Sequence, residues 1–176
     1  MFFNRIYRED GAPTEKLFLS KEVYRNALRS FVKYCHDIIL VGEDGYWYLP
    51  SRRDDNTFPG PWFIGGAVTP FISFKESLSQ LIRRELQLDI DPERLVHLGN
   101  FRCFFRGDAQ KNAHDAVSEL FVLKLSMQEI DAITLDKSEY IENSLKKYTR
   151  EDISVIPEKL NRKILLEAWD DYSKMI

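Results

Sequence analysis

The chain has 176 residues, of which 44% are hydrophobic and 13% aromatic, and its formal net charge is −3. This length and apolar content exclude a disordered chain and predict one folded domain with a substantial core. The small negative charge provides no general attraction to nucleic acid or to an anionic membrane, so we expect neither as a partner.

The cysteines and the N-terminus indicate the compartment. Cys35 and Cys103 each lie inside an apolar run, without metal-binding or redox spacing. Buried free thiols are therefore favoured over a disulfide. The N-terminus has no apolar core of signal-peptide length, and no stretch approaches the roughly 20 apolar residues that cross a bilayer. We expect a soluble cytoplasmic protein.

The first part of the chain predicts a helix and then a hairpin. Ser20 resembles an N-cap, and helical apolar spacing continues to about Phe31. The run VKYCHDIILV predicts a strand, GEDG a turn, and YWYLPSRR the returning strand. After the loop DDNTFPGP, the run WFIGG predicts a short strand that ends at Gly65 and Gly66.

A central amphipathic helix is predicted from Ser73 to Leu88. Ser73 and Glu76 match a capping box, in which each side chain bonds the backbone N–H of the other. The predicted apolar face consists of Leu78, Leu81, Ile82 and Leu86.

The second half predicts two paired strands, a further strand and a terminal helix. RLVHLGNFRCFFRG predicts a strand, GDAQKNAHD a polar loop, and AVSELFVLKLSM a strand that pairs back on the first. EYIENSLKKYT predicts another strand, and PEKLNRKILLEAWDDYSKM a helix with Pro157 near its first position. The order of elements predicts an α+β fold with a mixed β-sheet between helical layers.

Two acidic residues lie four positions apart beside the apolar face of the central helix. On one helix face, Glu85 and Asp89 would have Cβ atoms about 5–6 Å apart. Such carboxylates can converge on Mg²⁺ or Mn²⁺, with a backbone carbonyl of Gly66 as a further ligand. Arg84 would orient a carboxylate or contact phosphate. The alternative is a solvated helix face, with Glu76 acting only as a cap.

The stretch GGAVTPFISFKESLSQLIRRELQLDI resembles the Nudix box, G-x5-E-x7-R-E-U-x-E-E-x-G-U, in which U is a bulky aliphatic residue. The residues that fit E-x7-R-E-U are Glu76, Arg84, Glu85 and Leu86, and Asp89 stands at the last glutamate of the pattern. The preceding PGPWFIGG also resembles the approach to that box. The resemblance implies a Nudix-type α/β/α sandwich over residues 17–176, with a loop-helix-loop Nudix box at about 65–91 and an N-terminal extension at 1–16.

The sequence departs from this pattern in three places. Nine residues separate Gly66 from Glu76 where the pattern has five, and Leu88 and Asp91 replace a glutamate and the final glycine. The resemblance implies a Mg²⁺-dependent hydrolase of a nucleoside diphosphate linked to another group. The departures keep open an alternative, a non-catalytic module that binds nucleotides or regulates a partner.

Within this superfamily, the chain most resembles GDP-mannose mannosyl hydrolases. The shared features are a helix such as FLSKEVYRNALRSF, an arginine near Arg53, a box without its full EE pair, and a turn such as GNF. The resemblance implies a nucleotide-sugar substrate and a base in a late loop. His114 and Glu119 are the candidates for that base; the alternatives are a solvated loop histidine and a strand-surface glutamate.

Arginines and aromatic residues provide candidates for substrate contacts. Arg52 and Arg53, at the end of a strand, would clamp phosphate, unless they are simply surface arginines. Arg102 and Arg106 would meet a nucleotide if they face the cleft, although an amphipathic strand also explains them.

Three aromatic residues are candidates for stacking on a base: Phe58, Trp62 and Phe104. For Trp62 a core role is favoured. His36 and His97 fall within strand patterns and are expected to be core or edge histidines with satisfied nitrogens. The segment MFFNRIYRED exposes apolar residues that would pack on a partner, so a homodimer is an open prediction.

Overall fold

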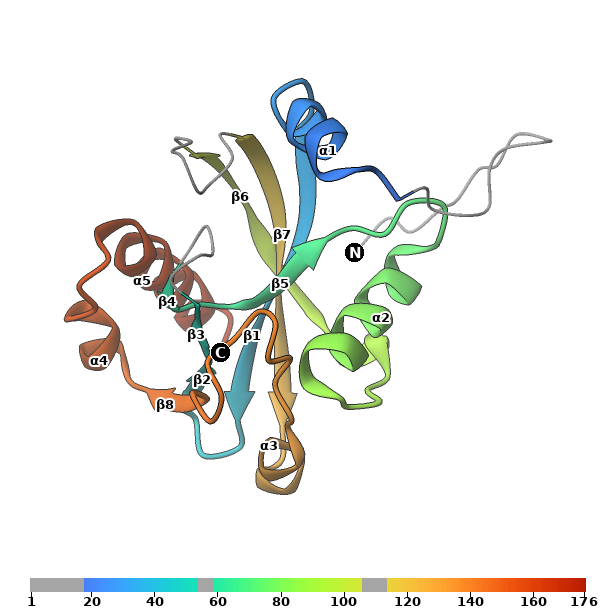
Figure 1. The fold of residues 1–176 in the computed structure, drawn as a ribbon. Helices are drawn as coiled ribbons and strands as arrows, with labels where there is room; N and C mark the ends of the chain where they lie inside the picture. Colours follow the sequence, from blue (N-terminus) through green and yellow to red (C-terminus); the bar gives the residue numbers. More distant parts are fainter. Residues whose placement is uncertain (1–17, 54–58, 106–113) are drawn as a thin grey trace.

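A computed structural model describes residues 18–53, 59–105 and 114–176 (Figure 1). The expected N-terminal extension at 1–16, with its dimer contact, lies outside the described residues. So do Phe58 and Arg106.

A mixed β-sheet forms the centre, in the order β6-β7-β1-β2-β8 with β5 also paired to β1. Its strands are β1 (Val32–Gly42), β2 (Trp47–Leu49), β5 (Ile64–Ala67), β6 (Val96–Phe105), β7 (His114–Leu125) and β8 (Lys146–Tyr148). Strands β1 and β7 are parallel, and the other pairs are antiparallel. The predicted β1–β2 hairpin and β6–β7 pair are confirmed. A separate two-stranded ribbon joins β3 (Ser51–Arg52) to β4 (Gly60–Pro61).

Helices cover both faces of this sheet, which confirms the predicted α+β sandwich (Figure 1). They are α1 (Lys21–Leu28), α2 (Phe74–Leu86), α3 (Met127–Ala132), α4 (Arg150–Ser154) and α5 (Lys159–Ser173), with a short 3₁₀ turn, η1 (Pro92–Arg94). Helix α2 packs on one face, while α4 and α5 pack on the other.

Strand β1 shows why the sheet is buried on both sides. Its residues Ile38 and Leu40 belong to the core beneath α2, whereas Ile39 and Val41 belong to the core beneath α5. Because successive side chains of a strand point to opposite faces, a continuous apolar run is typical of a strand covered on both faces.

Local capping signals locate the helix starts well. The Ser20 side chain accepts a hydrogen bond from the backbone of Val23, and the Ser73–Glu76 capping box forms as predicted. In α5 the N-cap is Glu158, so Pro157 lies directly before the cap, near the first helical position.

Three predicted elements are wrong in extent. Helix α1 ends at Leu28 and not at about Phe31. Helix α2 ends at Leu86 and not at Leu88, because Gln87 has a φ of 55° in the left-handed region and closes the helix onto the Arg83 carbonyl. Of the strand predicted over residues 139–149, only β8 forms, and Asn143, with a φ of 55°, lies in the turns that precede it.

The cysteines are free thiols, as predicted, with Cys35 half-buried and Cys103 buried. Across the described ranges, no helix combines the length and the apolarity that a bilayer crossing requires.

Candidate functional site

Glu85 presents a buried carboxylate oxygen that lacks a well-formed hydrogen bond, although the Tyr140 side chain interacts with this carboxylate. The side chain lies in the last turn of α2 and is 1% exposed. Its Oε1 accepts hydrogen bonds from Arg84 Nε at 2.8 Å and Nη2 at 2.6 Å, whereas its Oε2 is buried without a hydrogen bond. Burial raises the pKa of Glu85, and Arg84 offsets part of this effect. A desolvated, unbonded oxygen is costly, so it indicates a place for a cation or a donor.

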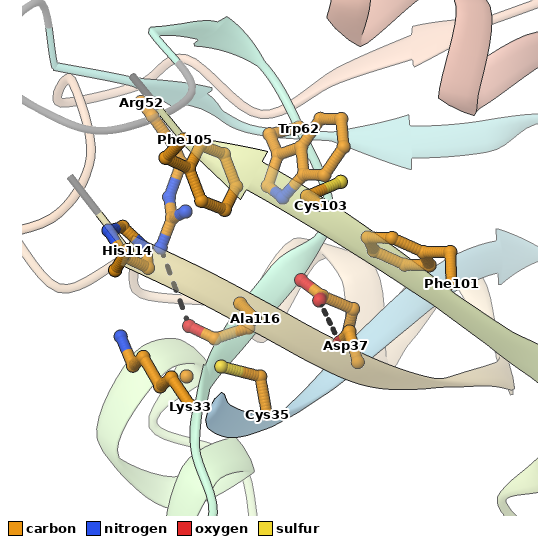
Figure 2. A pocket seen from close by; sticks show the side chains of 13 residues that line it. Lys33, Cys35, Asp37, Arg52, Trp62, Phe101, Cys103, Phe105, His114 and Ala116 are labelled. Atoms are coloured by element: carbon orange, nitrogen blue, oxygen red, sulfur yellow. Dashed lines mark hydrogen bonds between the residues drawn. The ribbon is translucent and has the colours of Figure 1, made fainter. Parts of the chain in front are cut away.

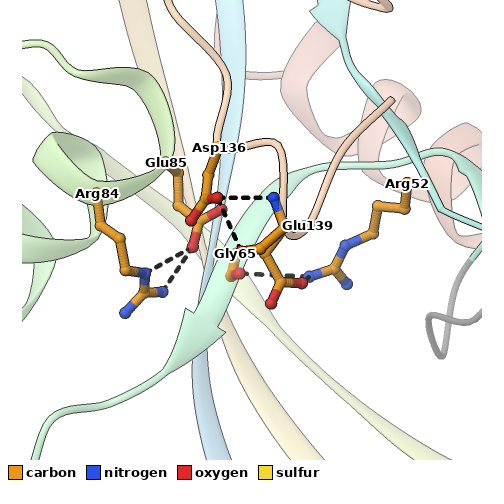
Figure 3. A network of polar contacts seen from close by, with 7 residues as sticks. Arg52, Gly65, Arg84, Glu85, Asp136 and Glu139 are labelled. Atoms are coloured by element: carbon orange, nitrogen blue, oxygen red, sulfur yellow. Dashed lines mark hydrogen bonds and ion pairs between the residues drawn. The ribbon is translucent and has the colours of Figure 1, made fainter. Parts of the chain in front are cut away.

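The C-terminal end of α2 holds the segment 134–140 beside this carboxylate. The amide of Thr134 donates to the Leu86 carbonyl at 3.0 Å, and the amide of Asp136 donates to the Glu85 carbonyl at 3.1 Å. Carbonyls in the last turn of a helix lack intrahelical partners, so these bonds satisfy them. Glu139 is thereby placed near Glu85, and its charge raises the Glu85 pKa (Figure 3).

Sequence reasoning missed Glu139 and Tyr140, which reach the site through this docking. Burial raises the pKa of Tyr140, and the Glu85 charge adds to this effect. The Tyr140 hydroxyl lies between the Glu85 carboxylate and the Gly65 carbonyl and interacts with both. The segment carries no local motif, and it is held beside Glu85 by its bonds to the helix end and by its pairing with Arg52 and Arg53.

Arg52 approaches the same cluster from the β3 side. Its Nη2 lies 3.5 Å from the Gly65 carbonyl oxygen and 3.8 Å from Glu139 Oε2 (Figure 3). The guanidinium carbon is 5.9 Å from the ring centroid of Tyr140. The Arg52 side chain is only 12% exposed, and its buried Nε forms no hydrogen bond within the described part of the chain. Arg52 therefore retains donor capacity for an anion next to Glu85.

The glycine pair contributes differently from the expectation. The Gly65 carbonyl faces Arg52, away from β1. Since neighbouring residues of a strand direct their carbonyls to opposite edges, the Gly66 carbonyl faces β1. The carbonyl at the site is therefore that of Gly65, and the expectation of the Gly66 carbonyl is wrong. Gly66 instead leaves space for Arg84, whose Nη2 would lie 2.8 Å from a Cβ at that position.

Asp89 does not join Glu85. Its Oδ1 accepts hydrogen bonds from Arg83 Nε at 3.0 Å and Nη2 at 2.6 Å, and the Asp89 side chain is 79% exposed. Because α2 ends at Leu86, Asp89 has left the helix. The expectation of two carboxylates on one helix face is wrong.

A pocket on the α5 side of the sheet adjoins this cluster and shares Arg52 and Gly65 with it (Figure 2). His114 lines the pocket, as the first residue of β7 rather than part of a loop. Its ring stacks on Phe105 with centroids 4.4 Å apart. Of the two candidate bases, His114 therefore shares a pocket wall with Arg52.

Glu119 lies on the opposite face of the sheet. It follows Ser118, which lines the pocket, so its own side chain points toward α2. Tyr34 Oη donates to Glu119 Oε1 at 2.6 Å, and His97 pairs with Glu119 Oε2. Since β1 lies between β7 and β5, the structure does not bring Glu119 to Glu85.

The two remaining arginine candidates within the described residues, Arg53 and Arg102, lie in different surroundings. Arg53 is exposed, and its amide donates to the Glu139 carbonyl at 3.3 Å. Arg102 pairs with Asp115 and lies over the Phe104 ring, as expected for an amphipathic strand.

The aromatic and histidine expectations are partly confirmed. Trp62 is buried in the core as predicted, and it also borders the pocket. Phe104 is exposed. His97 has a partner in Glu119, but both ring nitrogens of the buried His36 lack a hydrogen bond, so the expectation of satisfied nitrogens is wrong for His36.

Oxygen atoms at the site suit a hard divalent cation. The described residues include no group of three Asp, Glu, His or Cys side chains arranged to hold a metal ion. Glu85, Glu139 and the Gly65 carbonyl nevertheless lie side by side (Figure 3), and Mg²⁺ commonly takes only one or two carboxylates, with water and phosphate completing its shell. The unbonded Glu85 Oε2 fits this requirement.

Comparison with known proteins identifies the fold. No protein-family model matches the chain, and no curated protein matches it. Among solved structures, the MutT protein of Methanosarcina mazei Go1 is 18% identical over 81% of this chain and 96% of its own, with a TM-score of 0.60. The Nudix domain of Shewanella oneidensis NrtR, complexed with ADP ribose, is 16% identical over 88% and 99% of the two chains, with a TM-score of 0.57. A C. elegans Ap4A hydrolase is 15% identical over 82% and 100%, with a TM-score of 0.55. The chain therefore has the Nudix fold.

Proposed function

We propose that this chain is a hydrolase, dependent on a divalent cation, that cleaves a nucleoside diphosphate linked to another group. The observation that carries the proposal is the buried Glu85 carboxylate, whose Oε2 lacks a well-formed hydrogen bond and which lies beside Gly65, Glu139 and Arg52 (Figure 3). The fold supports it, since the solved structures that share the fold include an Ap4A hydrolase.

Each residue of the cluster has a distinct role. Glu85, Glu139 and the Gly65 carbonyl would hold Mg²⁺ or Mn²⁺, which when bound neutralises charge on the diphosphate. Arg84 is a positioning residue that fixes the Glu85 carboxylate through two hydrogen bonds. Arg52 donates to phosphate oxygens, because a planar guanidinium suits them and this one retains an unbonded Nε.

A nucleotide sugar of the GDP-mannose type is the substrate we propose to test first. The support for this choice is the sequence resemblance to GDP-mannose mannosyl hydrolases. Of the two candidate bases, His114 lines the pocket that Arg52 shares, whereas the Glu119 carboxylate is engaged on the far face of the sheet.

The test is turnover of a panel of GDP-, UDP- and ADP-sugars and Ap4A with Mg²⁺ or Mn²⁺, with products separated by chromatography. We expect at least one substrate to be cleaved, and Glu85→Gln to reduce kcat by about 100-fold or more. Glu93→Gln is the matched control, since Glu93 is exposed on η1 and pairs with Lys75. Absence of turnover throughout the panel, or full activity of Glu85→Gln, contradicts the proposal.

A second candidate function is nucleotide binding without hydrolysis. It is favoured by the departures from the box, because Leu88 occupies a glutamate position and Asp89 is turned to solvent. This candidate predicts that nucleotides raise the melting temperature while remaining intact. Multiple turnovers per enzyme molecule rule it out.

A further inference from the structure

Asp37 is a buried carboxyl group that the proposed chemistry does not use. It lies on β1, lines the pocket and is 7% exposed. Ser118 Oγ donates to its Oδ2, and the Trp62 indole also hydrogen-bonds the carboxyl group. These two donors leave acceptor capacity, because a carboxylate has about four lone-pair sites.

Asp37 reaches the junction between the pocket and the Glu85 cluster. It is the strand partner of Gly65, and a Cβ at position 65 would lie 2.9 Å from Asp37 Cγ. The missing side chain of Gly65 thus allows the carboxyl group to approach the backbone that borders both sites. Arg52 also lines both (Figures 2 and 3). A nucleoside diphosphate with its phosphates at Arg52 can therefore extend its nucleoside toward Asp37.

The pocket walls suit a flat ring. Phe101 and Phe105 come from β6, Trp62 lies beside them, and the ring of His114 stacks on Phe105 (Figure 2). Aromatic walls favour a planar, apolar body, whereas a buried carboxylate demands hydrogen-bond donors at its edge.

We propose that Asp37 determines substrate specificity by accepting hydrogen bonds from a nucleobase with two adjacent N–H donors, as guanine presents with N1–H and its 2-amino group. This inference rests on the proposed function, which places the diphosphate at Arg52. A carboxylate can accept two parallel N–H bonds. Hypoxanthine and uracil each present a single ring N–H on the corresponding edge, and xanthine directs a carbonyl oxygen at the carboxylate.

Binding of nucleoside diphosphates tests this base preference separately from catalysis. The probes are GDP, IDP, XDP and UDP, titrated calorimetrically with Mg²⁺, and chromatography at the end checks that they are intact. We expect wild-type protein to bind GDP about 10- to 100-fold more tightly than IDP, since one charge-assisted hydrogen bond is lost. Equal affinity for GDP, IDP and UDP, or no binding of any of them, overturns the proposal.

The substitution Asp37→Asn should reverse the preference for GDP over XDP. It replaces one acceptor oxygen by an NH₂ donor, which matches N1–H and the 2-carbonyl of xanthine. We expect the variant to bind XDP more tightly than GDP, the reverse of wild type. An unchanged GDP preference in the folded variant overturns the proposal.

A second variant covers the outcome in which Asp37→Asn does not fold. Ala116 lines the pocket from β7, so Ala116→Leu should fill it and weaken GDP binding at least tenfold while binding of inorganic pyrophosphate is unchanged. Full GDP affinity in that variant places the base elsewhere and overturns the inference. Hydrolysis without base preference removes only this inference, whereas a GDP preference without any hydrolysis removes only the proposed function.

Discussion

The buried histidine His36 allows a quantitative test of the packing between the sheet and α2. Its ring is 1% exposed, packs edge-on against Phe74 of α2 and Phe121 of β7, and has no hydrogen bond on either nitrogen. Burial lowers the pKa of His36 from 6.5 to about 4, although the charge of Glu119 offsets part of the effect. The imidazole is therefore neutral in the folded protein at pH 7.

The lowered pKa of His36 determines the direction and the size of the change in unfolding free energy with pH. The contribution of neutral His36 to the free energy of unfolding is fully present above pH 6.5. It is lost progressively as the pH falls from 6.5 through about 4. At about 1.4 kcal/mol per pKa unit, the loss is about 2 kcal/mol at pH 5 and about 3 kcal/mol at pH 4. His36→Leu has no proton to gain, so its stability relative to wild type should rise by these amounts between pH 7.5 and pH 4.

Urea unfolding of both proteins at several pH values measures this difference, because shifts common to both cancel. Ile38→Leu is the matched control, a substitution on the same strand face whose effect should not vary with pH. A His36→Leu difference that stays constant with pH, or that shrinks toward pH 4, refutes a buried neutral imidazole.

Further predictions concern the glycine pair and the acidic residues. Gly65→Ala should destabilise the fold by about 1–3 kcal/mol, because the new Cβ would lie 2.9 Å from Asp37 Cγ and 3.0 Å from the His36 carbonyl oxygen. Gly99→Ala, with no atom within 4 Å, should change stability by less than about 0.5 kcal/mol in the same thermal melts. Glu139→Gln should lower kcat/KM at least tenfold, whereas the exposed Asp89→Asn should stay within about twofold of wild type. If Asp89→Asn instead lowers kcat/KM more than Glu139→Gln does, Asp89 belongs to the site and this assignment is wrong.

Local signals in the sequence were sufficient for most of the fold. The Ser73–Glu76 capping box and the apolar run of β1 involve only neighbouring residues and the alternation of strand faces, and both are confirmed. The resemblance to the Nudix box pointed to Arg84 and Glu85, which the structure joins by two hydrogen bonds.

Contacts distant in sequence account for the parts that were missed. Gln87 is not a typical helix-ending residue, yet α2 closes there while the segment from Thr134 to Asp136 occupies the carbonyls of its last turn. The same contacts bring Glu139 close to Glu85, so Glu139, and not the expected Asp89, is the second carboxylate near Glu85. Neither effect has a signature within a short window of sequence.

The central claim is that the unbonded Glu85 oxygen holds a divalent cation, and titration with Mn²⁺ followed by electron paramagnetic resonance tests it directly. We expect wild-type protein and Glu93→Gln to bind Mn²⁺ equally, and Glu85→Gln to bind it at least about tenfold more weakly. Equal Mn²⁺ affinity in wild type and Glu85→Gln would contradict the account.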